Sequence, residues 1–249
     1  AYEIPDAGRQ AKGTNLINLI AIEADEKIQT VLTVTDKKKE GFLFMGTKKG
    51  IVKKTPISEF KNLRKNGLIA ISLKDGDELL KVKNTYGDAN IMVVTQNGYA
   101  VKFNEQDVRP MGRTASGVRA INLKGDDIAV CMDIAVDGEE LLVISENGFG
   151  KRTPITQYKL QNRGGVGLIT YRISEKTGKL VGATICKVDD ELMLINSSGV
   201  AIRINVADIS VTSRSAMGVT LMRTNEAEKV VAITKILSSN DSDEEDNDT

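Results

Sequence analysis

Residues 42–50 (FLFMGTKKG) form an apolar run that ends in polar residues and a glycine. The same pattern recurs in residues 91–98 (IMVVTQNG), 141–148 (LLVISENG) and 192–199 (LMLINSSG), so the closing glycines lie 48, 50 and 51 residues apart. A period near 50 residues is typical of propellers and related arrays, in which each copy is one supersecondary unit. The sequence therefore predicts a fold of repeated units.

Each copy predicts a β-hairpin. A buried strand leads to a tight turn whose glycine adopts positive φ, and a second strand returns. The Asn-Gly pairs at 97–98 and 147–148 are the clearest turns. A base follows four positions after each closing glycine, and these bases are Lys54, Lys102, Arg152 and Arg203.

A second landmark is an arginine four residues before a glycine. It occurs as Arg9 with Gly13, Arg113 with Gly117, Arg163 with Gly167, and Arg214 with Gly218. Residues 62–67 (NLRKNG) take this place in the second repeat, with Arg64 displaced by one position. An apolar stretch, an acidic turn and a further strand follow each of these glycines, which indicates about four short strands per repeat.

These observations predict an all-β, β-propeller-like ring of four-stranded blades, each about 50 residues long. Five repeats are visible, the first without its leading strand and the last without its closing one. We expect helix only as single turns at residues 56–60 and 154–158, where proline is tolerated in a first turn. Residues 1–237 form the predicted repeat domain, and residues 238–249 a disordered acidic tail.

The composition narrows the possible functions. The chain has no histidine and two cysteines, which excludes Ser-His-Asp and Cys-His catalysis and all histidine or cysteine-only zinc sites, so we expect no catalytic or metal site. Cys131 and Cys186 are predicted to be buried free thiols. Residues 240–249 hold six acids, so the body has 34 bases against 28 acids, a net charge of +6. No apolar run approaches the roughly 20 residues of a membrane span.

A basic rim is the first functional hypothesis. Residues 51–60 (IVKKTPISEF) and 149–158 (FGKRTPITQY) place adjacent bases at one position of two repeats, and a ring would align such bases in a belt that neutralises DNA phosphates. The alternative is a solvated face that also blocks edge pairing. The predicted phosphate contacts are Arg9, Lys12, Lys53, Lys54, Arg64, Lys65, Lys102, Arg113, Arg119, Lys151, Arg152, Arg163, Arg203 and Arg214.

A glycine-rich loop is the second candidate site. It consists of Gln161, Asn162, Arg163, Gly164, Gly165, Val166 and Gly167. Glycines let the backbone approach a phosphate and expose its N–H groups, while the arginine supplies charge and a forked donor. The alternative is an inter-strand loop that only needs positive φ.

This heptad resembles the gyrase box of the DNA gyrase A subunit, and residues 1–13, 108–117 and 207–218 also resemble parts of its C-terminal domain. The resemblance covers the chain to about Leu237. It implies a six-bladed β-pinwheel that wraps double-stranded DNA around its rim and presents it to a type II topoisomerase core for ATP-dependent negative supercoiling. The implied partners are the catalytic core of the gyrase A subunit, formed by its N-terminal part, and the gyrase B subunit, in a cytoplasmic, chromosome-associated enzyme. ATP and Mg²⁺ would be used elsewhere in that enzyme, and no cofactor is expected in this chain.

Two departures from the family pattern qualify the resemblance. Asn162 and Val166 stand where the box has bases, and the family's functional box lies in the first blade. We therefore expect the chain to start after that blade, which leaves its ability to wrap DNA alone open. The alternatives are the homologous domain of topoisomerase IV, which supports decatenation, and a protein-binding propeller scaffold.

Overall fold

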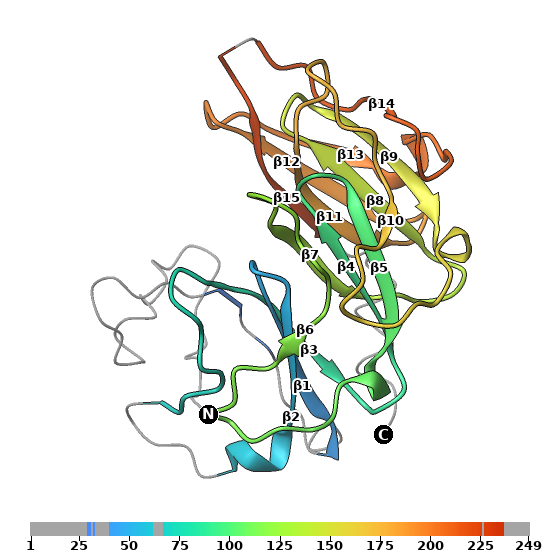
Figure 1. Ribbon diagram of the computed structural model, residues 1–249. Helices are drawn as coiled ribbons and strands as arrows, with labels where there is room; N and C mark the ends of the chain where they lie inside the picture. Colours follow the sequence, from blue (N-terminus) through green and yellow to red (C-terminus); the bar gives the residue numbers. More distant parts are fainter. Residues whose placement is uncertain (1–28, 31, 33–39, 62–66, 226, 237–249) are drawn as a thin grey trace, which may run out of the picture.

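The computed structural model describes residues 29–30, 32, 40–61, 67–225 and 227–236. These residues form an all-β structure of four antiparallel sheets that follow one another in a propeller-like arrangement (Figure 1), which confirms the predicted fold class. The first of the five predicted repeats and the acidic tail lie largely outside the described residues.

Each sheet is built on one of the predicted hairpins. The hairpins are β1 (Phe42–Thr47) with β2 (Ile51–Pro56), β4 (Asn90–Thr95) with β5 (Tyr99–Asn104), β8 (Glu140–Ser145) with β9 (Phe149–Pro154), and β12 (Glu191–Asn196) with β13 (Ala201–Asn205). Gly98 closes its turn with φ of 83°, a conformation that glycine adopts without steric cost. The prediction of repeated hairpins is confirmed.

An inner strand completes the repeat on the other side of each hairpin. These strands are β3 (Leu79–Thr85), β7 (Ala129–Ile134), β11 (Leu180–Cys186) and β15 (Val230–Ile236). They pair with β1, β4, β8 and β12, respectively. Neighbouring sheets meet along them, because β3 contacts β7, β7 contacts β11, and β11 contacts β15.

The remaining short strands belong to the sheet of the preceding repeat. β6 (Val118–Arg119), β10 (Leu168–Ile169) and β14 (Val219–Thr220) pair with β2, β5 and β9. We call them the exchanged strands. The sequence pattern predicts four strands within each repeat, whereas each of the first three sheets receives its fourth strand from the next repeat. In the described residues the fourth sheet has only β13, β12 and β15, because β14 of the same repeat pairs with β9 of the third sheet.

A loop carrying one of the landmark arginines leads into each exchanged strand. We name these loops the Arg113 loop (residues 109–117), the Arg163 loop (159–167) and the Arg214 loop (210–218). Each is preceded by a single 3-10 turn, namely η4 (Glu105–Asp107), η5 (Ile155–Gln157) or η6 (Val206–Asp208), and η3 (Ile57–Phe60) follows β2. The predicted turns near Pro56 and Pro154 are therefore confirmed, and two further turns form without proline.

The hydrophobic cores lie between neighbouring sheets. One joins Phe44 and Val52 of the first sheet to Val93 and Val101 of the second. Another joins strands of the second and third sheets around Tyr158 and Tyr171. Burial of each large aliphatic side chain contributes about 1.5–3 kcal/mol. Cys131 and Cys186 are buried free thiols, as predicted, and burial raises the pKa of each to about 12.

Candidate nucleic-acid interface

Five of the predicted phosphate contacts lie inside the protein. They are Lys53, Lys54, Lys102, Lys151 and Arg152, all at most 8% exposed, and Lys53 and Lys151 have no exposed surface. The prediction of an exposed rim at these positions is therefore wrong. Their strands β2, β5 and β9 are covered by the arginine loop and exchanged strand of the next repeat. Carbonyl groups of these loops and of the 3-10 segments before them accept hydrogen bonds from the buried cations.

In each of these strands, the basic residue four positions after the turn glycine connects its sheet to the 3-10 turn of the next repeat. Lys54 Nζ donates to the carbonyl of Glu105 at 2.9 Å, and Lys102 Nζ donates to that of Ile155 at 3.4 Å. Arg152 donates to the carbonyl of Ile209 at 2.8 Å. Charge-assisted hydrogen bonds of this kind stabilise the contact between consecutive sheets.

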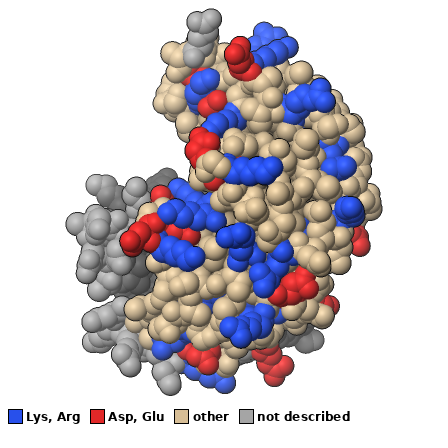
Figure 2. Space-filling model, in the orientation of Figure 1, with Lys and Arg blue, Asp and Glu red and all other residues tan. Residues whose placement is uncertain are grey.

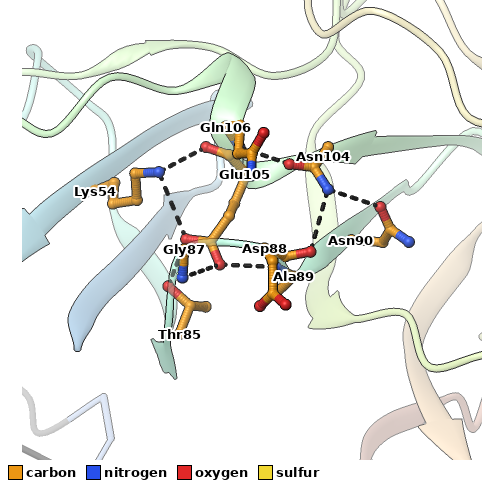
Figure 3. A network of polar contacts seen from close by, with 9 residues as sticks. All are labelled: Lys54, Thr85, Gly87, Asp88, Ala89, Asn90, Asn104, Glu105 and Gln106. Carbon is orange, nitrogen blue, oxygen red and sulfur yellow. Dashed lines mark hydrogen bonds and ion pairs between the residues drawn. The ribbon is translucent and has the colours of Figure 1, made fainter. Parts of the chain in front are cut away.

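Lys54 also faces a buried carboxylate. Its Nζ lies 3.6 Å from Oε2 of Glu105, whose side chain has no exposed surface. The Glu105 carboxylate further accepts hydrogen bonds from Thr85 Oγ1 and from the N–H groups of Gly87 and Ala89 (Figure 3). This network joins β2 and β3 of the first sheet to η4 of the next repeat.

Arg203 occupies the same position in β13, yet it is exposed. Its Nε donates to Oε2 of Glu191, a neighbour in its own sheet, at 2.8 Å. The reason is that no further 3-10 turn covers β13 within the described residues. The predicted exposure therefore holds for Arg203 and fails for its three equivalents.

Lys53 and Lys151 occupy a second buried position, three residues after the turn glycine. Lys53 Nζ donates to the carbonyl of Arg113, and Lys151 Nζ donates to those of Ser213 and Arg214, both at 2.5 Å. Burial, and next to it the positive charge of Arg113 or Arg214, lowers the pKa of each lysine to about 8.

These two lysines predict a pH dependence of stability. Each has a pKa of about 8 in the native protein and 10.5 when unperturbed, so between these pH values the unfolded chain binds more protons and the free energy of unfolding rises with pH. A Lys53→Met, Lys151→Met double variant lacks this rise. Urea unfolding of both proteins from pH 7.5 to 10 should show their stability difference growing with pH. Parallel pH profiles would contradict the assignment, because the cysteine and tyrosine titrations are common to both proteins.

The arginines of the three loops lie at the surface. Arg113, Arg163 and Arg214 are half-buried, and Arg119 is exposed. The guanidinium of Arg163 donates to the carbonyls of Asp107 at 2.9 Å and Arg119 at 3.1 Å, so it is partly held by the preceding loop. The structure thus keeps these predicted residues at one edge of consecutive sheets. Arg9, Lys12, Arg64 and Lys65 lie outside the described residues.

Three exposed bases are absent from the predicted phosphate contacts. Lys61, Arg109 and Lys159 each follow the hydrophobic residue that ends a 3-10 segment, namely Phe60, Val108 and Tyr158. They form no ion pair with any other residue that the structure describes. Their common position in the repeat was the signal that could have identified them. Basic side chains recur along the curved outer edge of the molecule in Figure 2.

The glycine-rich loop is bound to its neighbours through its backbone. The N–H of Gln161 donates to the carbonyl of Lys102 at 2.8 Å, and that of Gly164 to the carbonyl of Ala120 at 2.6 Å. The carbonyl of Gly165 accepts a hydrogen bond from the N–H of Asn122 at 2.8 Å. These contacts favour the alternative that this segment is an inter-strand loop whose glycines are needed for positive φ. Asn162 and Gly165 are exposed, whereas Val166 is half-buried.

In the described part of the chain, no cluster of three or more metal-ligating side chains occurs. None of its helical segments has the length and apolar character needed to cross a membrane.

Sheets that exchange edge strands, together with basic residues repeated along one outer edge, define a propeller-like repeat domain with a charged rim. The family model for the DNA gyrase C-terminal domain, beta-propeller, matches residues 1–35, 41–85, 89–130, 139–187 and 190–236. The chain belongs to this family.

The curated relatives are longer proteins. The chain is 56% identical over 236 residues to the DNA gyrase A subunit of Clostridium acetobutylicum, covering 95% of this chain and 28% of that protein. It is 42% identical over 244 residues to the DNA gyrase A subunit of Staphylococcus epidermidis, covering 96% of this chain and 27% of that protein. The chain therefore corresponds to the C-terminal domain of these proteins and spans a little over a quarter of their length.

Two solved structures have the same fold. The C-terminal domain of DNA topoisomerase IV superposes with a TM-score of 0.87 at 28% identity, covering 93% of this chain and 73% of that one. The DNA gyrase A C-terminal domain superposes with a TM-score of 0.80 at 27% identity, covering 92% of this chain and 76% of that one.

Proposed function

We propose that this domain binds duplex DNA along its outer edge, through the phosphate backbone and without reading base sequence. The observation that carries the proposal is the repetition of exposed bases in register. Lys61, Arg109 and Lys159 recur after η3, η4 and η5, close in sequence to the landmark arginines, whereas Ser210 takes this position after η6. Repeated point charges along a curved edge can follow a bent phosphate backbone, and contacts along the arc offset the elastic cost of bending.

The proposal extends to the whole enzyme. The bound DNA would be presented to the catalytic core of a type II topoisomerase, formed by the gyrase B subunit together with the rest of the gyrase A polypeptide, for ATP-dependent negative supercoiling. ATP, Mg²⁺ and strand cleavage are assigned to those other parts. A role in a cytoplasmic, chromosome-associated enzyme follows from this assignment. Identities of 42–56% to gyrase A proteins favour gyrase over topoisomerase IV.

Salt-dependent binding tests the proposal. The slope of log affinity against log salt should be about −0.9 per phosphate contact. Replacing Arg109 and Lys159 with alanine removes two exposed contacts, so we expect the slope to become shallower by about 2. The measurement is equilibrium binding of a plain duplex between low and moderate salt, repeated with an unrelated duplex sequence of equal length.

A matched control separates rim contacts from net charge. Lys48 and Lys229 lie beside the hollow between the inner strands, near Leu80, Val130 and Val181. Their double replacement with alanine removes the same charge from another surface, and we expect the slope to stay at the wild-type value. Equal slopes in both double variants would reject the rim. Absence of duplex binding by the unaltered chain would instead favour a protein-binding scaffold.

A further inference from the structure

The position of Lys53 holds a lysine and an aliphatic side chain in alternation along the four sheets. Lys53 in β2 and Lys151 in β9 are equivalent, while Val101 occupies this position in β5 and Ile202 in β13. Each of the first three residues lies in the strand that accepts an exchanged strand. The Arg113 and Arg214 loops therefore lie over a buried ammonium group, and the Arg163 loop lies over an apolar side chain.

The Arg113 loop has the carbonyl group of its arginine directed into the protein. The carbonyl of Arg113 accepts a hydrogen bond from Lys53 Nζ. The next carbonyl, that of Thr114, accepts from Ser72 Oγ at 2.7 Å. In a trans peptide the carbonyl of one residue and the N–H of the next point in opposite directions. The N–H of Thr114 consequently points outward, and Thr114 is exposed.

The Arg214 loop repeats this arrangement. Lys151 Nζ donates to the carbonyls of both Ser213 and Arg214 at 2.5 Å, so both of these carbonyls point into the protein. The N–H groups of Arg214 and Ser215 therefore point outward, and Ser215 is exposed. Neither N–H, nor that of Thr114, has a backbone acceptor within the described residues.

The Arg163 loop has the opposite peptide orientation. The N–H of Gly164 points inward to the carbonyl of Ala120 at 2.6 Å, so the carbonyl of Arg163 points outward. Gly164 has φ of 82°, a conformation that L side chains rarely adopt. The peptide after the loop arginine thus offers a donor in two loops and an acceptor in the third.

We propose that Lys53 and Lys151 are positioning residues that make the Arg113 and Arg214 loops phosphate-binding sites, and that the glycine-rich Arg163 loop is not one. The inference rests on the proposed function, because it identifies where that function binds phosphate. Outward N–H groups beside a guanidinium form a concave donor site for an anion. An outward carbonyl in the same place repels it. Each buried ammonium adds positive charge beneath the site and fixes the direction of the peptide.

The test compares Lys53→Met and Lys151→Met with Lys102→Met, a control that removes a buried lysine bonded to a 3-10 turn. Backbone amide resonances are followed in the intact chain during titration with inorganic phosphate. The amides of Thr114 and Ser215 should shift saturably, and that of Gly164 should not. Lys53→Met should abolish the response of Thr114 and leave that of Ser215, Lys151→Met should do the reverse, and Lys102→Met should leave both.

The second measurement is the salt dependence of duplex DNA binding. Each methionine variant at 53 or 151 should make the salt slope shallower by about 1, and the control should not. Unchanged slopes together with unresponsive Thr114 and Ser215 amides in a protein that binds DNA would overturn the inference and leave the proposed function standing. Selective phosphate responses in a protein that does not bind duplex DNA would support the two phosphate sites and reject the proposed function. A Gly164 response equal to that of Thr114 would also overturn it.

Discussion

Replacing Glu105 with alanine is expected to lower the free energy of unfolding by about 3–5 kcal/mol. Glu105 has no exposed surface, and its carboxylate accepts hydrogen bonds from Thr85 Oγ1 at 2.8 Å, Gly87 N at 2.9 Å and Ala89 N at 2.8 Å (Figure 3). Alanine leaves these three donors without an acceptor and leaves Lys54, 5% exposed, without its counter-ion. Each unpaired buried group then carries its full desolvation penalty.

Urea unfolding of three variants measures this effect. Gln106→Ala alters the adjacent exposed side chain and should change stability by less than about 0.5 kcal/mol. Glu105→Gln keeps the shape and one acceptor oxygen but places an amide donor among donors, so its loss should fall between the other two. A loss below about 1 kcal/mol for Glu105→Ala would show that the network does not hold the first two sheets together.

The hairpins and turns could be predicted because their signals are local. Apolar runs and turn glycines such as Gly98 and Gly148 specify a strand, a reversal and a return within a short stretch of the chain. The exchanged strands could not be predicted in the same way. β6 and β10 are two residues long, too short to show a period, and the identity of the sheet they join depends on contacts between repeats.

The candidate site likewise contains residues that local sequence predicts and residues whose placement depends on contacts between repeats. Lys53 and Lys54 form a basic pair that resembles a solvated surface, and their burial depends on acceptors distant in sequence, among them the carbonyl groups of Arg113 and Glu105 in the next repeat. Sequence alone does not contain those carbonyl positions. Lys61, Arg109 and Lys159 could have been found, because they share one register position. The surface location of Arg113 and Arg214 was predicted correctly, although their binding role remains a prediction.

The second large effect is expected at a landmark glycine. Gly218 precedes β14 and has φ of 76°, and a Cβ built there would lie 2.1 Å from the carbonyl oxygen of Gly150. Gly150 belongs to β9 and pairs with Val219 of the exchanged strand, so neither backbone can move without breaking that pairing. The positive φ alone costs an L residue about 1–2 kcal/mol. Strain and lost pairing together should make Gly218→Ala about 4 kcal/mol less stable than wild type.

Gly125→Ala is the control that separates these two causes. Gly125 has φ of 60°, and nothing lies within 4 Å of a Cβ built on it, so alanine there experiences the backbone strain without the collision. We expect Gly125→Ala to lose about 1–2 kcal/mol in urea unfolding, against about 4 kcal/mol for Gly218→Ala. Hydrogen exchange of the amides in β14 should also accelerate in Gly218→Ala and remain slow in Gly125→Ala, because only the former displaces the exchanged strand. Equal stability losses with unchanged exchange in β14 would mean that the glycine four residues after each loop arginine is required for its dihedral angle alone. The close approach of the exchanged strand to the preceding sheet would then add no constraint.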